Sequence, residues 1–227
     1  MDKDNIYLLE LLYMNKDFIP IIRALRIPLI ILVLMWIVHI LNYYYHLNFH
    51  TYGIYPRNSE GLKGILFSPL IHSVKDHSHI INNSTPLIIL TWTLFYFYKK
   101  IAFHILLYSW FVVSIFVWIV ARDSYHIGMS GVIYSLVFYL FFSGVFRKDV
   151  RLMAVSLFVV FLYGSMVWGI FPYDWTMSFE SHFFGALVGI ILAIFYKNEG
   201  ATFKTEKTQW EIEEEMGIEP YDFENEL

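Results

Sequence analysis

Six stretches of this sequence contain no Asp, Glu, Lys or Arg, and this feature limits the possible fold more than any other. Lipid offers the backbone no hydrogen-bond partners, so such a run must satisfy its own N–H and C=O groups as a helix. Five runs have 19 to 22 residues, enough to cross a hydrocarbon layer about 30 Å thick, and the sixth has 16. We therefore predict an all-α membrane protein, a bundle of six transmembrane helices. The runs are Ile27–Tyr45, His79–Tyr98, Ile101–Ala121, Tyr125–Phe146, Leu152–Tyr173 and Ser181–Tyr196.

The composition fits a lipid environment. Of the 227 residues, 57% are hydrophobic and 16% are charged, whereas soluble domains have about 25% charged residues. The absence of cysteine excludes disulfides, cysteine nucleophiles and thiolate metal sites. Ten of the 20 acidic residues lie from Glu199 onward, so residues 197–227 are predicted to be an acidic tail. No continuous basic stretch suggests nucleic acid as a partner.

The basic residues favour one set of helix ends. Twelve of the 16 Lys and Arg lie on the side that holds both predicted termini, and four lie on the other side. Because cytoplasmic loops carry the excess of basic residues, we predict that both termini are cytoplasmic. Residues 1–26 would then form a cytoplasmic N-terminal segment and 27–196 the membrane domain, with a long loop, 46–78, on the outer face.

Polar residues gather where the second, fourth and sixth predicted helices begin, all on the outer side. The second run starts with His79 and reaches Asn83 one turn later. The fourth reaches Ser130 in its first turns, and the sixth has His182 as its second residue. Polar side chains are costly inside a membrane and mark functional sites there. We predict a site where these three clusters meet.

The spacing of small residues supports contact between the fourth and sixth predicted helices. His182, Gly185 and Gly189 are three and four residues apart, so they share one helix face. Small residues on such a face allow a second helix to approach closely, and Gly131 lies on the opposing helix. This contact is expected to bring Ser130 and His182 within the ~2.6–3.2 Å that proton transfer requires.

Two further features complete the inventory of an acyl-transfer site. Tyr134, four residues after Ser130, is positioned to support the imidazole. His79 and Asn83 are also four residues apart and offer two donors to a developing oxyanion. Asn82 is the alternative to Asn83 and is disfavoured by this spacing.

These motifs, in this order, resemble the rhomboid intramembrane proteases over residues 27–196. The resemblance rests on a Gly-x-Ser-Gly motif, a His-x-x-Gly-x-x-x-Gly motif, a His-x-x-x-Asn motif, a tyrosine four residues after the serine, and two loop segments. The matching positions are Gly128–Gly131, His182–Gly189, His79 with Asn83, Tyr134, Tyr55-Pro56-Arg57 and Ser68–His72.

The resemblance implies an intramembrane serine endopeptidase that cuts transmembrane segments of other proteins and uses no metal or organic cofactor. Its catalytic dyad would be Ser130 as nucleophile and His182 as general base and then acid. The Ser130 backbone N–H, His79 and Asn83 would form the oxyanion hole. The supporting residues would be Gly128, Gly131, Tyr134, Gly185 and Gly189. The compact six-helix form is similar to that of bacterial rhomboids, which implies a bacterial cytoplasmic membrane and a site open to its outer face.

One spacing departs from the family pattern. The loop histidine and the second-helix histidine are usually about five residues apart, but His72 and His79 are seven apart. His77 has the usual spacing, yet the residue four positions later is Ile81, which cannot donate a hydrogen bond. We assign the oxyanion role to His79 and keep His77 as the alternative.

Other functions compete with the protease hypothesis. A non-catalytic rhomboid relative that binds membrane clients, or less favourably a small transporter, would have the same six spans. A metal site among the nine histidines is disfavoured because they show no convincing ligand spacing. Glu180 adjoins His182, but neighbouring residues on a helix diverge by about 100°, so it is not expected to orient the imidazole.

Overall fold

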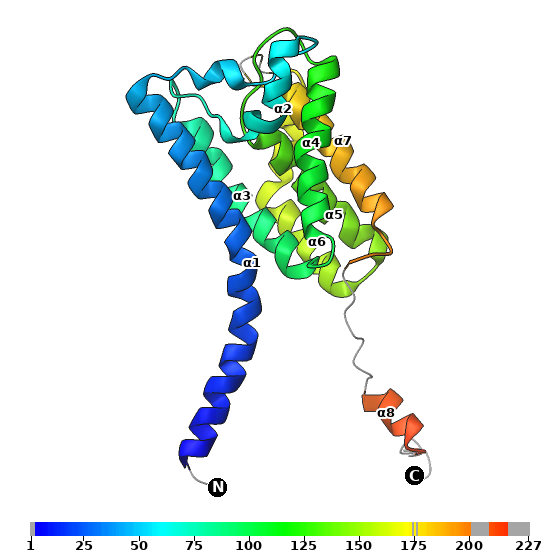
Figure 1. Cartoon of the computed structure of the whole chain (residues 1–227). Helices are drawn as coiled ribbons and strands as arrows, with labels where there is room; N and C mark the ends of the chain where they lie inside the picture. The colour runs from blue at the N-terminus through cyan, green and yellow to red at the C-terminus, as the bar shows by residue number, and fades with distance from the viewer. Residues whose placement is uncertain (1–2, 174, 176, 201–208, 218–227) are drawn as a thin grey trace.

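The computed structural model describes residues 3–173, 175, 177–200 and 209–217. Within these residues the fold is all-helical, with eight α-helices, four short 3-10 helices and one isolated bridge between Ile54 and His126. The long helices stand together as one bundle (Figure 1). They are α1 (Lys3–Tyr45), α3 (Ser78–Phe97), α4 (Ala102–Val120), α5 (Ser130–Arg147), α6 (Val150–Tyr163) and α7 (Phe179–Phe195); the short α8 (Gln209–Glu215) follows.

The predicted outer loop is a folded layer rather than an extended strand of chain. It contains η1 (Phe49–Tyr52), η2 (Ser59–Lys63), α2 (Gly64–Phe67) and η3 (Ser68–Leu70). In Figure 1 it covers the upper end of the bundle, and we call this the loop end. Two indoles of α4 hold it there, since Trp110 Nε1 donates to the carbonyl of Leu66 (3.1 Å) and Trp118 Nε1 to that of Asn58 (3.0 Å).

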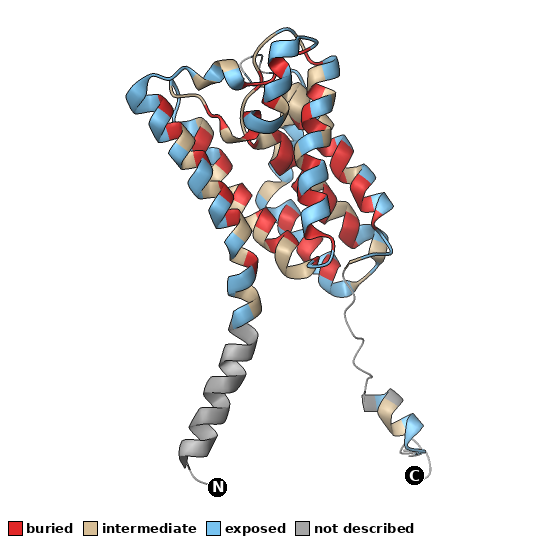
Figure 2. Ribbon diagram, viewed as in Figure 1, coloured by how far each residue is buried: buried red, intermediate tan, exposed pale blue. Residues whose placement is uncertain are grey.

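Exposed residues cover the outward faces of the bundle (Figure 2), and many of them are large and hydrophobic, as lipid contact requires. Large hydrophobic side chains such as Val150 and Phe161 are 80% and 85% exposed, and rows of them run along α1, α4 and α6. Soluble monomers rarely expose apolar surface on this scale. Together with the lengths of the helices, this surface identifies an integral membrane protein.

Four helices are long and apolar enough to cross a membrane, which confirms part of the predicted span count. These spans are Ile19–Tyr45, Ala102–Val120, Ser130–Arg147 and Val150–Ile170. The helix α7 is apolar but has 17 residues, and α3 is more polar because its first half contains Asn82 and Asn83. The six-span topology therefore stays a prediction.

Several helix boundaries differ from those predicted. The first helix begins at Lys3 and passes through Pro20 and Pro28, so the segment 1–26 is continuous with it where the structure describes it. The fourth predicted helix begins at Ser130 rather than at Tyr125. The fifth becomes a 3-10 helix, η4 (Gly164–Ile170), before the apolar run ends. The absence of charge shows where lipid can be tolerated, but it does not fix where α-helical hydrogen bonding starts.

The helix α5 lies at the centre of the bundle. It contacts α3, α4, α6 and α7, and 61% of its span is buried, compared with 22% to 33% for the other three spans. Its packing against α7 depends on glycine. A Cβ on Gly185 would lie 2.3 Å from the carbonyl oxygen of Gly131, and one on Gly189 would lie 2.3 Å from that of Ser135. The two backbones are thus in direct contact.

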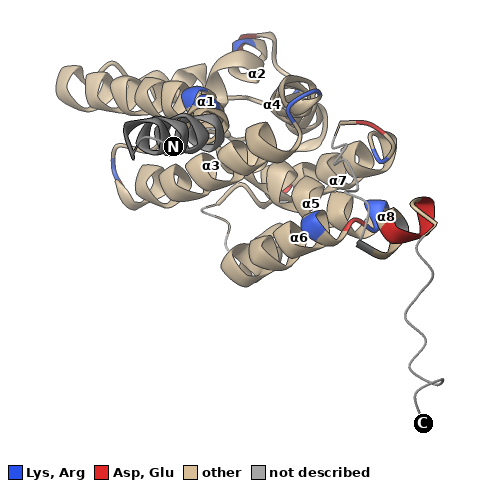
Figure 3. Ribbon diagram, turned by 90° about the horizontal axis from the view of Figure 1, so that it is seen from below, with Lys and Arg blue, Asp and Glu red and all other residues tan. Residues whose placement is uncertain are grey.

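Basic residues lie at the end of the bundle opposite the loop (Figure 3). Here Arg147, in the last turn of α5, donates from Nη2 to the carbonyls of Tyr196 and Glu199 just after α7, and from Nε to Ser143 Oγ (2.9 Å). A cation at this position complements the negative end of the α7 dipole. That this end faces the cytoplasm stays a prediction from the charge distribution.

Candidate functional site

A strained turn delivers Ser130 to the first position of α5. Gly128 has φ of +112°, and a Cβ there would lie 2.6 Å from Nε2 of His79, so only glycine fits. The loop holds this turn from outside: the Gly128 N–H donates to the Ser68 carbonyl (2.9 Å) and the Met129 N–H donates to Nε2 of His72 (3.3 Å).

The structure brings the predicted nucleophile and base together from different helices. Nε2 of His182, on α7, lies 2.9 Å from Oγ of Ser130, and Nδ1 lies 2.9 Å from the carbonyl oxygen of Gly169. Because a carbonyl can only accept, Nδ1 carries the imidazole proton and Nε2 is left to accept the serine hydroxyl proton. This is the geometry that an activated serine needs.

The tyrosine after the serine supports the imidazole in two ways. The rings of Tyr134 and His182 are stacked, with centroids 4.1 Å apart and planes 5° from parallel. The Tyr134 hydroxyl donates to the carbonyl of Met166 (2.8 Å). Both Met166 and Gly169 belong to η4, so this short 3-10 helix supplies carbonyl acceptors to both stacked rings. No pattern in the sequence indicated η4, because its residues lie inside an apolar run.

Within the described residues the imidazole contacts a backbone carbonyl and no carboxylate. Glu180 instead forms an ion pair with Arg122, whose Nε lies 3.6 Å from Oε1, and accepts from the Arg122 backbone N–H (3.4 Å). Arg122 also donates from Nη2 to the carbonyls of Trp175 (2.9 Å) and Met177 (2.7 Å). Glu180 and Arg122 therefore secure the chain that enters α7, in agreement with the expectation that Glu180 does not orient His182.

The structure separates the two alternatives for the second-helix histidine. His79 lies beside Gly128, and its ring centroid is 4.9 Å from that of His72. His77 is turned toward α1, where its Nδ1 lies 2.9 Å from Nε2 of His39. His79, and not His77, is therefore the residue next to the turn that carries Ser130.

The two asparagines are also distinct. Asn83 is 5% exposed, and its Nδ2 donates to the carbonyl of His79 (2.6 Å). A side-chain amide carries two N–H groups, so a second donor remains on Asn83. Asn82 is exposed. The buried position of Asn83, on the first turns of α3, is the one that faces the protein interior.

His72 is a site residue whose contact the sequence did not reveal. It is 1% exposed, and burial together with the neighbouring His79 lowers its pKa to about 3. It is therefore neutral at ordinary pH and can accept the Met129 N–H, directly before Ser130. In the sequence, His72 served only as the end of a loop motif and as a spacing marker for His79. No three His, Asp or Glu side chains in the described part of the chain are grouped closely enough to hold a metal ion.

A small cavity lies behind the turn. Its volume is about 20 Å³, and it is bordered by Ser68, Ser114, Gly128, Gly131 and Ser181, among other residues. A cavity needs about 10–15 Å³ to hold one water, and a buried water needs two to four polar partners. The cavity is therefore large enough for a single water molecule, and three serines are among the residues that border it.

Comparisons with known proteins point to one family. The family model described as the Rhomboid domain matches residues 59–199. Two mycobacterial proteins, one from Mycobacterium tuberculosis and one from Mycobacterium bovis, are each 26% identical to the chain over 150 residues, and both carry the name "uncharacterized protein". The matched region covers 62% of this chain and 62% of each relative.

The contacts of η4 predict a selective effect of Gly169→Ala. The new Cβ would lie 2.0 Å from the Tyr134 hydroxyl and 3.3 Å from Nδ1 of His182, so it must displace the stacked rings. We expect labelling of Ser130 by a fluorophosphonate probe to slow by at least about tenfold, because a misplaced base loses most of its 10²–10⁴-fold effect. Gly164→Ala, in the same 3-10 helix, is the control, since its Cβ would make only an ordinary 3.5 Å contact with Val160. Equal labelling rates in the two variants would contradict this role of η4.

The lowered pKa of His72 predicts acid sensitivity. Between pH 6.5 and about 3 the unfolded chain binds a proton at this position that the folded chain excludes. The contribution of neutral His72 to the free energy of unfolding is thus complete above pH 6.5. As the pH falls below 6.5, this contribution declines by about 1.4 kcal/mol per pH unit. Melting temperatures in detergent micelles from pH 7 to pH 4 should fall more steeply for the parent than for His72→Gln. The control His104→Gln, at an exposed position, should keep the parent's slope, and an unchanged slope in His72→Gln would refute the assignment.

Proposed function

The chain belongs to the rhomboid family, and on that premise we propose that it is an intramembrane serine endopeptidase with Ser130 and His182 as its catalytic dyad. The observation that carries the proposal is the 2.9 Å contact between Ser130 Oγ and His182 Nε2, in a bundle whose outer faces are apolar. A serine–histidine pair with the opposite imidazole nitrogen fixed by an acceptor is the arrangement of an activated nucleophile.

The proposed reaction is acyl transfer to serine followed by hydrolysis. Ser130 Oγ forms a bond to the carbonyl carbon of the substrate peptide while His182 Nε2 takes the hydroxyl proton. His182 then gives this proton to the leaving nitrogen as the C–N bond breaks. Water attacks the resulting ester with the same histidine as base, which releases the acid product and restores Ser130. The Gly169 carbonyl keeps the proton on Nδ1 throughout, so Nε2 is the nitrogen that exchanges it.

The proposed oxyanion donors are N–H groups near Ser130 that the structure does not already pair with another acceptor. The first N–H groups of a helix have no intrahelical acceptor, and the helix dipole favours negative charge there. Ser130 is the first residue of α5, while the N–H of Met129 is already donated to His72. We therefore assign the oxyanion to the Ser130 N–H, to the second amide hydrogen of Asn83, and to His79 beside Gly128.

The proposed substrates are transmembrane segments of other proteins, cut near the membrane surface at the loop end. A helical segment has its backbone hydrogen-bonded internally, so segments that unwind easily, with Gly, Ser or Pro, are the favoured class. The excess of basic residues at the opposite end supports a site that opens to the outer face of a bacterial cytoplasmic membrane.

Covalent labelling tests the proposal without knowledge of the substrate. We expect a fluorophosphonate probe to label the detergent-purified parent, but not Ser130→Ala, and to label His182→Ala at least about 10²-fold more slowly because the general base is lost. The readout is probe fluorescence on the protein band over time. The second measurement is the cleavage of a model transmembrane substrate in lipid vesicles by the same three proteins.

Each outcome of that series is informative. Equal labelling of all three proteins would mean that Ser130 is not the reactive serine. A parent that neither takes the probe nor cuts membrane substrates would refute the protease proposal and favour a relative that binds membrane clients without cutting them.

The two asparagines give a matched test of the oxyanion hole. Asn83→Ala should lower kcat by about 10²–10³, the usual cost of one oxyanion donor. Asn82→Ala, one residue away and exposed, should stay within about twofold of the parent. Both are measured as initial cleavage rates at saturating substrate. Comparable rates for the parent and Asn83→Ala would show that the donor lies elsewhere.

A further inference from the structure

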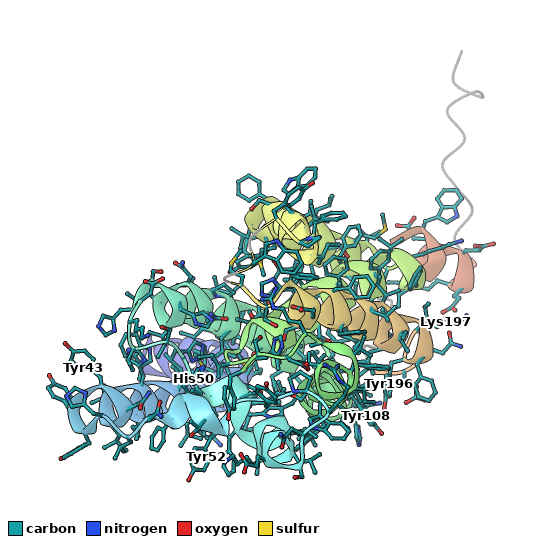
Figure 4. The ribbon with its side chains drawn as sticks, turned by 90° about the horizontal axis from the view of Figure 1, so that it is seen from above. Tyr43, His50, Tyr52, Tyr108, Tyr196 and Lys197 are labelled. Carbon is teal, nitrogen blue, oxygen red and sulfur yellow. The ribbon has the colours of Figure 1, made fainter. Side chains whose placement is uncertain are left out.

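A cleft at the loop end, distinct from the Ser130–His182 pair, is lined by two tyrosines, an asparagine and a glutamate. Its volume is about 290 Å³, and its walls are Tyr55, Asn58, Glu60 and Tyr125. Ligand pockets begin near 300 Å³, so the cleft suits one side chain or a group of that size. Figure 4 looks down on this end of the bundle, where His50 and Tyr52 mark the loop.

The backbone builds the aromatic part of the cleft. The bridge between Ile54 and His126 has two hydrogen bonds, of 3.0 and 2.8 Å, and it is antiparallel. The residue after one partner therefore lies beside the residue before the other, which brings Tyr55 next to Tyr125. Their ring centroids are 5.0 Å apart, and His50 packs edge-on against Tyr125 at 4.7 Å. Both rings are thus held in position before any ligand arrives.

The main chain of Glu60, whose side chain is exposed, is also held in place. The Glu60 N–H donates to Asn58 Oδ1 (2.8 Å), and the carbonyl of Asn58 accepts from Trp118 (3.0 Å). A Cβ on Gly61 would lie 2.0 Å from the carbonyl oxygen of Tyr55, so the η2 turn rests directly on the backbone of Tyr55. Glu60 is therefore anchored beside the tyrosines through its main chain.

The charge of the cleft is negative because nearby cations are held elsewhere. Arg57 donates to the carbonyl of Ala121 (2.7 Å) and to the carboxylate of Asp123. The Lys63 ammonium lies 4.4 Å from the centre of the Tyr52 ring. The ion pairs in the described part of the chain do not include Glu60. Tyrosine faces beside a carboxylate are the combination that attracts an ammonium or guanidinium group.

The cleft lies within reach of the nucleophile. Tyr125 is five residues before Ser130, and an extended chain covers at most about 3.6 Å per residue. The Cα atoms of Tyr125 and Ser130 are therefore less than about 18 Å apart. A substrate that enters as an extended chain would cover it with about five residues.

We propose that this cleft binds the Lys or Arg side chain of a substrate, within about five residues of the scissile bond. The proposal deepens the proposed function and rests on it. It assigns the protein a preference for substrates with a cation next to the cut, in addition to any preference set at Ser130.

The test compares two model transmembrane substrates that differ only by Lys or Gln, with the variable residue moved through the five positions on each side of the cut. Cleavage by the full chain is measured in maltoside micelles, which contain no amines. The parent should cleave the best Lys substrate with a kcat/KM about 3- to 10-fold above that for Gln, as expected for a cation–π site. Glu60→Gln and Tyr125→Leu should abolish this ratio without changing the rate for the Gln substrate. Glu214→Gln, at an exposed position on α8, removes the same charge outside the cleft and should keep the ratio.

Binding to the Ser130→Ala protein separates the cleft from catalysis. Fluorescence anisotropy should show that the Ser130→Ala protein binds the Lys substrate more tightly than the Gln substrate, by a similar factor. The double variant Ser130→Ala, Glu60→Gln should bind the two substrates equally. Equal kcat/KM and equal binding for Lys and Gln at every position would overturn the cleft proposal, while continued cleavage by the parent would leave the protease proposal standing. Addition of phosphatidylethanolamine tests a lipid amine as the ligand instead. If it changes the cleavage rate of both substrates equally, and only when Glu60 is present, the cleft binds a lipid amine and the proposal is overturned.

Discussion

The contact between the backbones of α5 and α7 is the constraint on which the rest of the site depends. Gly185 and Gly189 leave no room for a Cβ, because carbonyl oxygens of α5 lie 2.3 Å from the positions that it would occupy, and a Cβ on Gly131 would be tightly placed, 3.0 Å from Val113. In lipid there is little hydrophobic force between helices, so close van der Waals packing must hold them. The same approach sets Ser130 and His182 at hydrogen-bond distance, so one set of glycines serves both assembly and geometry.

The polar groups of the site are satisfied largely by main-chain atoms. Carbonyls of η4 accept from both His182 and Tyr134, and the loop supplies the Ser68 carbonyl to the turn before Ser130. A buried polar atom without a partner is costly, and more so where water is scarce. Backbone carbonyls meet this need without the additional charge that an orienting carboxylate would bring. The exception is His72, a buried side chain that must stay neutral to accept the Met129 N–H.

The loop has more than a covering role. Its indole contacts to α4 and its bridge to His126 tie it to α4 and to the segment between α4 and the turn that carries Ser130. The same bridge sets Tyr55 against Tyr125 and so forms one wall of the acidic aromatic cleft. The orientation of the nucleophile and the shape of the nearby surface therefore share one structural origin.

The sequence by itself determined the membrane class and the family, and it predicted the residues at the centre of the candidate site. Uncharged runs are a direct requirement of lipid, and the glycine spacings on one helix face are local, so both can be read along the chain. Only the tertiary structure decided where α5 begins, since a turn through Gly128 interrupts an uncharged run. It alone revealed that η4 holds the imidazole and that His72 reaches Met129, and it placed His79, not His77, beside Gly128. Each of these depends on contacts between residues distant in the chain, and such contacts leave no periodic pattern in the sequence.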